Sequence, residues 1–200
     1  MINLVDMDLQ QKPLREFSRF YEKALLSNQQ SIEASCVSTI NMHKKSAHSR
    51  FVNIKYVNNQ DFIFFSNYES NKANEIKTSS KVSMAFYWNT INVQIRIEGN
   101  INKIDEIVSD KHFNIRGDEK NALAISSRQS RKIDSYELVK KNYKIQLDKA
   151  NKTFKRPIYW GGYSISPYYF EFWEGHKSRL NKRDVYEKNL DNWNHFLLHP

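Results

Sequence analysis

The sequence predicts an α+β fold, in which a small antiparallel, Greek-key-like β-barrel carries flanking helices. Short segments rich in β-branched and aromatic residues follow one another through the first half of the chain, and segments with helical periodicity precede and follow them. A helix, then a run of short strands, then helices and further strands is typical of α+β proteins with a barrel. We expect residues 1–200 to form one domain, because this length is ordinary for one domain.

An amphipathic helix is expected at about residues 13–27. Pro13 suits the first turn of a helix, where its missing N–H needs no partner. Apolar residues then recur at steps of three and four positions, which places them on one helical face: Leu14, Phe17, Tyr21 and Leu25. We therefore expect Phe17 and Tyr21 to belong to the core.

Short strands are expected next, at residues 34–40, 50–55, 62–66, 82–87 and 93–99. In the last of them, Val93, Ile95 and Ile97 alternate with polar residues, as in a half-buried strand. A short helix is expected between the strands at residues 70–77, with Ser70 as its N-cap.

The second half of the chain is expected to begin with helices at residues 105–115, 121–127 and 134–149. Asp134 and Glu137 stand at the spacing of a capping box at the start of the last helix. A polar connection at residues 149–157 then leads to C-terminal strands between about residues 158 and 200, expected at 161–166, at 168–175 and across 178–188.

The charge of the chain favours anionic partners. There are 31 Lys and Arg residues against 22 Asp and Glu residues, which gives a net charge of +9. Such a charge suits nucleic acid, an acidic membrane surface or phosphorylated small molecules, and composition alone does not choose among them. Cys36 is the one cysteine, so no intramolecular disulfide is expected. With no signal-peptide pattern and no long apolar run, we expect a cytoplasmic protein without a membrane span.

The common backbone cradles for phosphate are missing from the sequence. The five glycines form neither GxGxxG nor GxxxxGK[ST], so a bound phosphate would need Arg and Lys side chains. The histidines show no metal-binding spacing, so no metal site is expected. Candidate anion-binding segments are SRFVNIK with Arg50 and Lys55, SNYESNK with Ser66 and Lys72, and SRLNKR.

The segment SRLNKR admits two interpretations. Arg179, Asn181 and Arg183 occupy alternate positions, so in an extended segment all three side chains would share one face and could clamp an anion. The alternative is an ordinary exposed strand edge protected by Lys and Arg.

Several segments in one order resemble the pyridoxamine (pyridoxine) 5′-phosphate oxidase family. They are FIFFSNYESNKANEI, FYWNTINVQIRIEG, SSRQSRKI and YWGGYSISPYYFEFWEGHKSRLNKR, and the likeness runs from about Pro13 to Pro200. The resemblance implies an FMN-binding split barrel and a homodimer with FMN at the subunit interface. It also implies an oxidase that transfers hydride from pyridoxine or pyridoxamine 5′-phosphate to flavin N5. Dioxygen would then be reduced to hydrogen peroxide, and the product would be pyridoxal 5′-phosphate.

The resemblance also implies a set of cofactor residues. Arg50 would lie near the flavin, where a cation favours the reduced anionic ring, and Lys72 matches the lysine that binds phosphate. Asn71 stands where the family usually has arginine, which removes one cation from the FMN phosphate site. The FMN-binding residues expected from the matched motifs are Arg50, Phe51, Val52, Lys55, Phe65, Ser66, Lys72, Gln94, Gln129, Ser130, Trp173 and Arg183.

The substrate-binding positions differ from the family pattern more than the cofactor-binding positions do. Lys55, Arg116 and Arg179 match residues that grip the substrate, with Arg116 facing its phosphate and with Lys55 and Arg179 as the catalytic candidates. Three other positions differ, because the family usually has tyrosine, serine and histidine where this chain has His112, Lys120 and Asn181.

These departures leave several functions open. The chain is interpreted either as a divergent oxidase of vitamin B6 phosphates or as a relative that oxidises another ring system, as in phenazine biosynthesis. The retained Arg116 and the added Lys120 favour a phosphorylated substrate. A protein that only carries FMN or pyridoxal phosphate is a third interpretation. Nucleic-acid binding is not expected, because the aromatic residues between Arg156 and Arg183 are better explained as barrel strands than as an exposed stacking groove.

Overall fold

The computed structural model describes residues 1–149 and 154–200, and the expected polar connection at 149–157 lies partly outside these ranges. The helices are α1 (Lys12–Leu26), α2 (Asn71–Thr78), α3 (Glu106–Ile115), α4 (Asp118–Ser126) and α5 (Tyr136–Leu147). The strands are β1 (Asn3–Met7), β2 (Ala34–Asn41), β3 (Ser46–Asn59), β4 (Asp61–Asn67), β5 (Lys81–Trp88), β6 (Val93–Lys103), β7 (Trp160–Glu174), β8 (Lys182–Asn189) and β9 (Asn192–Leu197).

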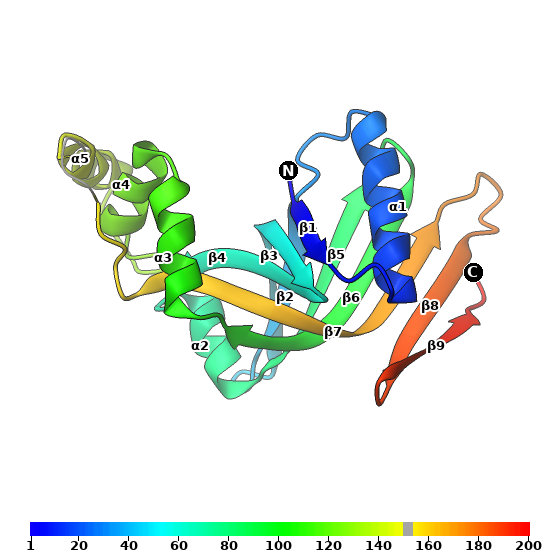
Figure 1. The fold of residues 1–200 in the computed structure, drawn as a ribbon. Coiled ribbons are helices and arrows are strands. Elements are labelled where there is room, and N and C mark those ends of the chain that lie inside the picture. Colours follow the sequence, from blue (N-terminus) through cyan, green and yellow to red (C-terminus); the bar gives the residue numbers. More distant parts are fainter. Residues whose placement is uncertain (150–153) are drawn as a thin grey trace.

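Six of the strands close into a barrel. Strand pairing runs β3–β2–β5–β6–β7–β4 and returns from β4 to β3, and every one of these neighbouring pairs is antiparallel. Closure therefore gives each of the six strands two neighbours in the ring. β1 adds to β3 in parallel, while β8 and β9 continue the sheet beyond β7 (Figure 1). The α+β fold with an antiparallel barrel is therefore confirmed.

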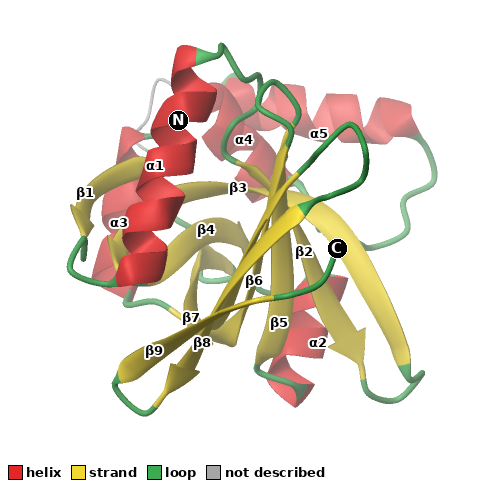
Figure 2. Cartoon of the chain, turned by 90° about the vertical axis from the view of Figure 1, so that its right-hand side faces the viewer, coloured by secondary structure: helices red, strands yellow, loops and turns green. Residues whose placement is uncertain are grey.

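Aromatic residues from α1 and the barrel form the core. Phe17 is fully buried, and its ring lies 5.0 Å from that of Phe62 and 5.5 Å from that of Phe86, centroid to centroid. Tyr21 is buried on the same helical face. The spacing of three and four residues in the sequence thus predicted the buried face of this helix correctly. α1 and α2 lie on opposite sides of the barrel in both ribbon views (Figures 1 and 2).

Helices α3, α4 and α5, which we call the helical arm, lie at the end of the molecule away from β8 and β9 (Figure 1). The arm is attached where β7 begins. The backbone N–H of Gly162 donates to Ser109 Oγ at 3.1 Å, and the ring of Phe113 lies 5.3 Å from that of Trp160. A Cβ on Gly162 would overlap the side chain of Ile104. The glycine pair after Trp160 therefore permits close packing within this chain.

Some elements differ from those expected. β7 is one continuous strand through Pro167, where two strands were predicted. Pro167 pairs with Gly99 next to a shift in register, and such an irregularity tolerates a residue without an N–H. β1 and β9 were not expected; each is short and pairs with only one neighbour, so tertiary pairing decides whether it forms.

The helix caps also correct the sequence interpretation. The N-cap of α5 is Ser135, whose Oγ accepts from Leu138 N at 3.2 Å, and not Asp134. Ser70 does stand at the N-cap of α2, but its hydroxyl donates to the Asn67 carbonyl instead of capping the helix.

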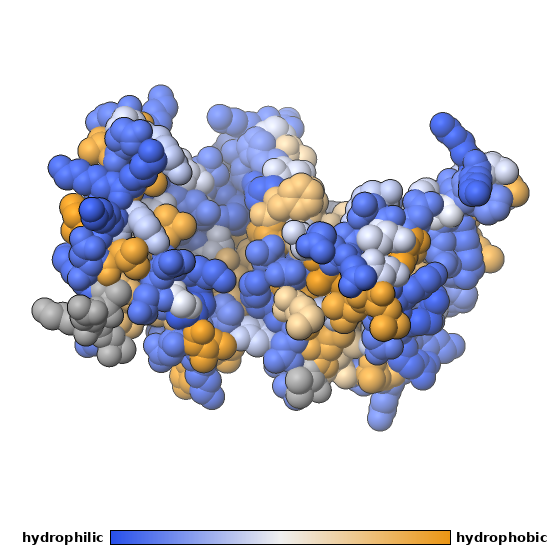
Figure 3. Space-filling view, turned by 90° about the horizontal axis from the view of Figure 1, so that it is seen from above, coloured by the Kyte–Doolittle hydropathy of each residue, from blue (hydrophilic) through white to orange (hydrophobic). Residues whose placement is uncertain are grey.

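The face of the molecule seen from above is mainly polar (Figure 3). Seen from above, hydrophilic residues cover most of the visible face, and hydrophobic residues form smaller patches between them (Figure 3). In the part of the chain that the structure describes, no helix has the length and apolar character needed to cross a membrane.

Candidate functional site

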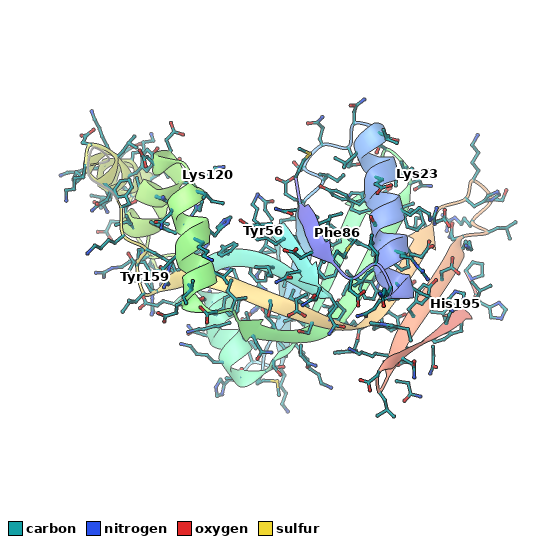
Figure 4. All side chains as sticks on the ribbon, viewed as in Figure 1. Lys23, Tyr56, Phe86, Lys120, Tyr159 and His195 are labelled. Atoms are coloured by element: carbon teal, nitrogen blue, oxygen red, sulfur yellow. The ribbon has the colours of Figure 1, made fainter. Side chains whose placement is uncertain are left out.

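A cavity of about 790 Å³ lies between the barrel, α2 and the helical arm. Figure 4 labels Tyr56 on the barrel and Lys120 on the helical arm, on either side of this region. Many of the residues expected to bind cofactor or substrate line the cavity: Arg50, Phe51, Val52, Lys55, Phe65, Ser66, Lys72, Arg116, Gln129 and Ser130. Three of the four positions that depart from the family pattern line it too: Asn71, His112 and Lys120. Segments far apart in the sequence are thus brought together.

Lys72 is a buried cation in the wall of the cavity. Its Nζ donates to Ser66 Oγ at 2.7 Å, to Ser70 Oγ at 3.0 Å and to Gln129 Oε1 at 2.9 Å. Burial, together with the nearby charge of Arg50, lowers the pKa of Lys72 to about 8. Its hydrogen-bond partners are neutral, so no charge compensates for burial or for the repulsion from Arg50. An anion bound here would stabilise the charged form of Lys72.

Arg50 is held from the side opposite the cavity. Its Nη1 donates to Thr39 Oγ1 at 2.6 Å and to the Val37 carbonyl at 3.3 Å, while its Nη2 lies 3.3 Å from Glu75 Oε2. Neighbours in β2 and α2 therefore fix the guanidinium before any ligand binds. The coupling of Arg50 to Lys72 makes these residues one group of cations.

Arg116 belongs to a second group of cations, at the junction of α3 and α4. Its guanidinium carbon lies 4.4 Å from the centroid of the Trp160 ring, and its Nη2 donates to the Lys120 carbonyl at 3.2 Å. Burial lowers the pKa of Arg116. Its Nη1 is buried and has no hydrogen-bond partner among the described residues. A buried donor without a partner is costly, and an anion in the cavity would satisfy it.

His112 stands beside this second group as a neutral ring. It stacks on Phe65 at 3.7 Å between centroids, with planes 9° apart, and its Nδ1 lies 2.8 Å from the Tyr56 hydroxyl. Burial, and then the charges of Arg116, Lys55 and Lys120, lower the pKa of His112 to about 4. At neutral pH the imidazole is therefore uncharged and acts through stacking and hydrogen bonding.

Gln94, Trp173 and Arg183 lie elsewhere and do not line the cavity. Gln94 pairs with Trp173 across β6 and β7, and Trp173 pairs with Arg183 across β7 and β8, so the three residues form one row across the sheet. Arg183 Nε donates to the buried Glu171 Oε1 at 2.7 Å, and Arg96 Nη1 lies 2.6 Å from Glu171 Oε2. Within a single subunit, the expected cofactor residues therefore lie in two separate sets, one in the cavity and one outside it.

Arg179 and Asn181 exclude the extended clamp, which was one of the two interpretations of SRLNKR. β8 begins only at Lys182, and Arg179 has a φ of 60° in the turn before it. The Asn181 side-chain oxygen accepts from His176 N at 3.0 Å within that turn. A turn does not preserve the alternation of a strand, so Arg179, Asn181 and Arg183 do not share a strand face. Arg179 is exposed and also stays outside the cavity.

Tyr56, Glu75 and Trp160 contribute to the site but were not expected there. Trp160 lies in the segment YWGGYSISPYYFEFWEGHKSRLNKR, whose aromatic residues were interpreted as parts of barrel strands. Glu75 follows Lys72 by three positions on a helix, a spacing that places both side chains on one face and could have indicated its role. Among the described residues, no cluster of His, Cys, Asp or Glu could hold a metal ion.

Comparisons with known proteins identify the family to which the chain belongs. A family model described as pyridoxamine 5′-phosphate oxidase matches residues 22–144, and one described as pyridoxine 5′-phosphate oxidase C-terminal dimerisation region matches residues 160–200. Pyridoxine/pyridoxamine 5′-phosphate oxidase 1 of Hydrogenovibrio crunogenus is 35% identical over 196 residues, covering 96% of this chain and 90% of the relative. The pyridoxine/pyridoxamine 5′-phosphate oxidase of Leptospira interrogans is 33% identical over 190 residues, covering 94% and 88%.

Solved structures share the fold. PhzG from Burkholderia lata 383, in complex with tetrahydrophenazine-1-carboxylic acid, superimposes with a TM-score of 0.90 at 24% identity and covers 96% of this chain and 95% of that one. A pyridoxamine 5′-phosphate oxidase-related, FMN-binding protein from Nostoc punctiforme has a TM-score of 0.75 at 12% identity, with 94% and 98% covered. The split-barrel fold is confirmed. The chain belongs to the pyridoxamine 5′-phosphate oxidase family of FMN-dependent oxidoreductases, the family that its motifs predicted.

Proposed function

We propose that this protein is an FMN-dependent oxidase that converts pyridoxine 5′-phosphate or pyridoxamine 5′-phosphate to pyridoxal 5′-phosphate, with dioxygen reduced to hydrogen peroxide. The observation that carries the proposal is the presence of two groups of cations in one cavity. Arg50 and Lys72 form one, and Arg116, Lys120 and Lys55 form the other. Two phosphates, one from the cofactor and one from the substrate, would each find a positively charged site.

The first group fits the phosphate of FMN, so Arg50 is assigned here to the phosphate and not to the flavin ring. Lys72 is buried among neutral oxygens, and burial and the charge of Arg50 lower its pKa to about 8. Ser66, Gln129 and Ser130 add hydroxyl and amide groups to the same part of the cavity wall. The chain has no glycine-rich loop motif to bind phosphate through backbone N–H groups, so phosphate binding here depends on the side chains of the two cations. Asn71 supplies an amide at the position where a third cation is usual in the family.

The second group fits a phosphorylated substrate. Arg116 presents a buried Nη1 without a partner, and its guanidinium is fixed against Trp160. Lys120 adds an exposed cation at the mouth of the cavity, and Lys55 would hold the substrate between its phosphate and the cofactor. His112, neutral and hydrogen-bonded to Tyr56, would offer its ring edge to the substrate without adding charge.

FMN, when bound, supplies the redox chemistry by accepting a hydride at N5 and passing two electrons to dioxygen. The residues of the chain bind and orient the cofactor and the substrate. Arg116 and Lys120 would anchor the substrate phosphate, which places the 4′ carbon at a fixed distance from the anchor. Phe65 and His112 form a stacked pair in the wall of the cavity.

We propose further that the active protein is a homodimer in which the two sets of cofactor residues meet. Gln94, Trp173 and Arg183 form a row outside the cavity of their own subunit. In a dimer with two-fold symmetry, this row would complete the cavity of the partner, and each interface would contain two equivalent sites. The match of residues 160–200 to a dimerisation region supports this arrangement.

An anaerobic titration tests the reaction. The purified protein is loaded with FMN, pyridoxine 5′-phosphate is added without oxygen, and the visible flavin absorbance is followed. We expect the absorbance to bleach and then to recover when air is admitted. An Arg116→Met variant should need far more substrate for the same bleaching, whereas an Arg131→Met variant on the exposed surface should behave as the wild type.

A stable flavin spectrum would overturn the vitamin B6 assignment. The same titration with a reduced tricyclic substrate, of the phenazine-precursor type, then separates the two remaining functions. Bleaching by that compound alone would identify another ring substrate, and bleaching by neither would leave a carrier of FMN without turnover.

A further inference from the structure

We propose that Glu75 is a positioning residue, which aims the guanidinium of Arg50 at the phosphate of the cofactor. The inference rests on the proposed FMN site. Glu75 does not line the cavity, and its side chain is only 5% exposed. It therefore acts through Arg50 and not by touching the ligand.

The carboxylate of Glu75 is the centre of a hydrogen-bond network that joins three elements. It accepts from the Thr39 hydroxyl on β2, from His48 Nδ1 on β3 at 2.5 Å, and from Arg50 Nη2 on β3 at 3.3 Å. Burial alone would raise the pKa of Glu75, but the hydrogen bonds from Thr39 and His48 and the charge of Arg50 together lower it. The group is therefore a carboxylate at neutral pH.

The contacts of Arg50 show what the network achieves. A guanidinium has five N–H donors. The two on Nη1 are engaged by Thr39 and the Val37 carbonyl, and one on Nη2 is engaged by Glu75. The remaining donors, Nε–H and one N–H of Nη2, have no partner among the described residues. They form one edge of the guanidinium, the bidentate geometry that phosphate prefers.

The position of Glu75 on α2 connects the two cations of the phosphate site. Lys72 and Glu75 lie three residues apart on one helical face, and both are buried. Helix α2 therefore carries one phosphate-binding cation directly and controls the orientation of the other through its carboxylate. A role limited to folding would not require that the carboxylate contact the guanidinium that lines the cavity.

The test compares FMN with riboflavin, which lacks the phosphate. Apoprotein is titrated with each, and the dissociation constants are taken from the quenching of flavin fluorescence. We expect Glu75→Gln to weaken FMN binding about tenfold, a change of about 1.4 kcal/mol. Riboflavin binding should change little, because Arg50 has no phosphate to meet. Glu22→Gln, an exposed carboxylate on α1, is the matched control and should bind both flavins as the wild type does.

A double-mutant cycle tests whether Glu75 affects FMN binding through Arg50. In an Arg50→Met background, Glu75→Gln should have no further effect on FMN binding, because the residue that it positions is gone. Thr39→Val, which removes the hydroxyl shared by Arg50 and Glu75, should weaken FMN binding selectively as well. This variant keeps the test available if Glu75→Gln fails to fold.

Three results would overturn the inference. They are unchanged FMN binding in folded Glu75→Gln, an equal loss for FMN and riboflavin, and a full Glu75 effect that persists without Arg50. Failure of the proposed function looks different, because the wild-type protein would then bind FMN but pyridoxine 5′-phosphate would not bleach it.

Discussion

The ammonium group of Lys72 lies 2.7 Å from the hydroxyl of Ser66, and this contact joins the first turn of α2 to the end of β4. Both residues are buried and line the cavity. A lysine in this setting carries its charge at an energetic cost, which a bound phosphate would offset. Several measurable consequences depend on this arrangement and on the second set of residues across the sheet.

FMN affinity should fall as pH rises through about 8. The pKa of Lys72 is lowered to about 8 in the free protein, so above this pH the free lysine is neutral. A phosphate beside it favours the charged form, so binding takes up a proton, and affinity falls by up to about tenfold per pH unit. Titrations of apoprotein with FMN between pH 7 and pH 9.5 measure this dependence.

Variants at two lysines of α2 test whether Lys72 is the group that causes this pH dependence. Lys72→Met should weaken FMN binding at pH 7 and remove the step near pH 8, since no titrating group remains. Lys77→Met, which removes an exposed lysine from the same helix, should retain both the affinity and the step. A step of full size in Lys72→Met would assign the titration to another group.

Acid should destabilise the protein partly through His112. The pKa of His112 is about 4 in the folded chain, below its ordinary value of 6.5. Between these values the unfolded chain binds a proton that the folded chain does not, so stability falls as pH falls through this window. For a half-buried ring we expect about 1–2 kcal/mol of this loss between pH 7 and pH 5.

Urea unfolding at pH 7 and pH 5 distinguishes the contribution of His112 to this loss of stability from that of the carboxylates. His112→Phe keeps the stack on Phe65 and should lose less stability on acidification than the wild type. The exposed His43→Phe should match the wild type. Identical losses in all three proteins would show that His112 titrates normally.

Replacing Gly162 with alanine should destabilise the junction of barrel and arm. The added Cβ would overlap Ile104 and lie 3.0 Å from Phe65 Cε1 in the cavity wall. Overpacking of this kind costs about 1–3 kcal/mol. Gly117→Ala is the control for packing, because nothing lies within 4 Å of its Cβ and its φ is −64°; Gly117 is the N-cap of α4, so we expect only the smaller cost of a poorer cap. Equilibrium unfolding of both variants gives the comparison, and equal stabilities would contradict the packing argument.

A heterodimer with one intact site should form from two defective subunits. Lys72→Met and Arg183→Gln each damage every site in their own homodimers if each site combines Lys72 from one subunit with Arg183 from the other. In a heterodimer purified through two different tags, one site contains both wild-type residues and the other contains neither. We expect one tightly bound FMN per heterodimer. No tight binding would place both residues of a site in one subunit.

The sequence alone determined the local elements and the identity of the chemistry-bearing residues. The period of apolar residues predicted α1 and its buried face, because a single helix buries one stripe against any core. The motifs also selected Arg50, Lys72 and Arg116 as anion-binding residues. Their location in one cavity agrees with that selection, while their roles stay predictions.

Only the tertiary structure decided the long-range relationships. Closure of β4 onto β7 and the pairing of the short strand β1 depend on residues far apart in the chain, which no local pattern specifies. The same reason explains the unexpected network of Glu75 and the partnership of Tyr56 with His112, 56 positions away. It also explains why Arg179, Asn181 and Arg183 do not share the one face that an extended segment would have given them. Alternation holds only inside a strand, and pairing with β7 starts that strand at Lys182.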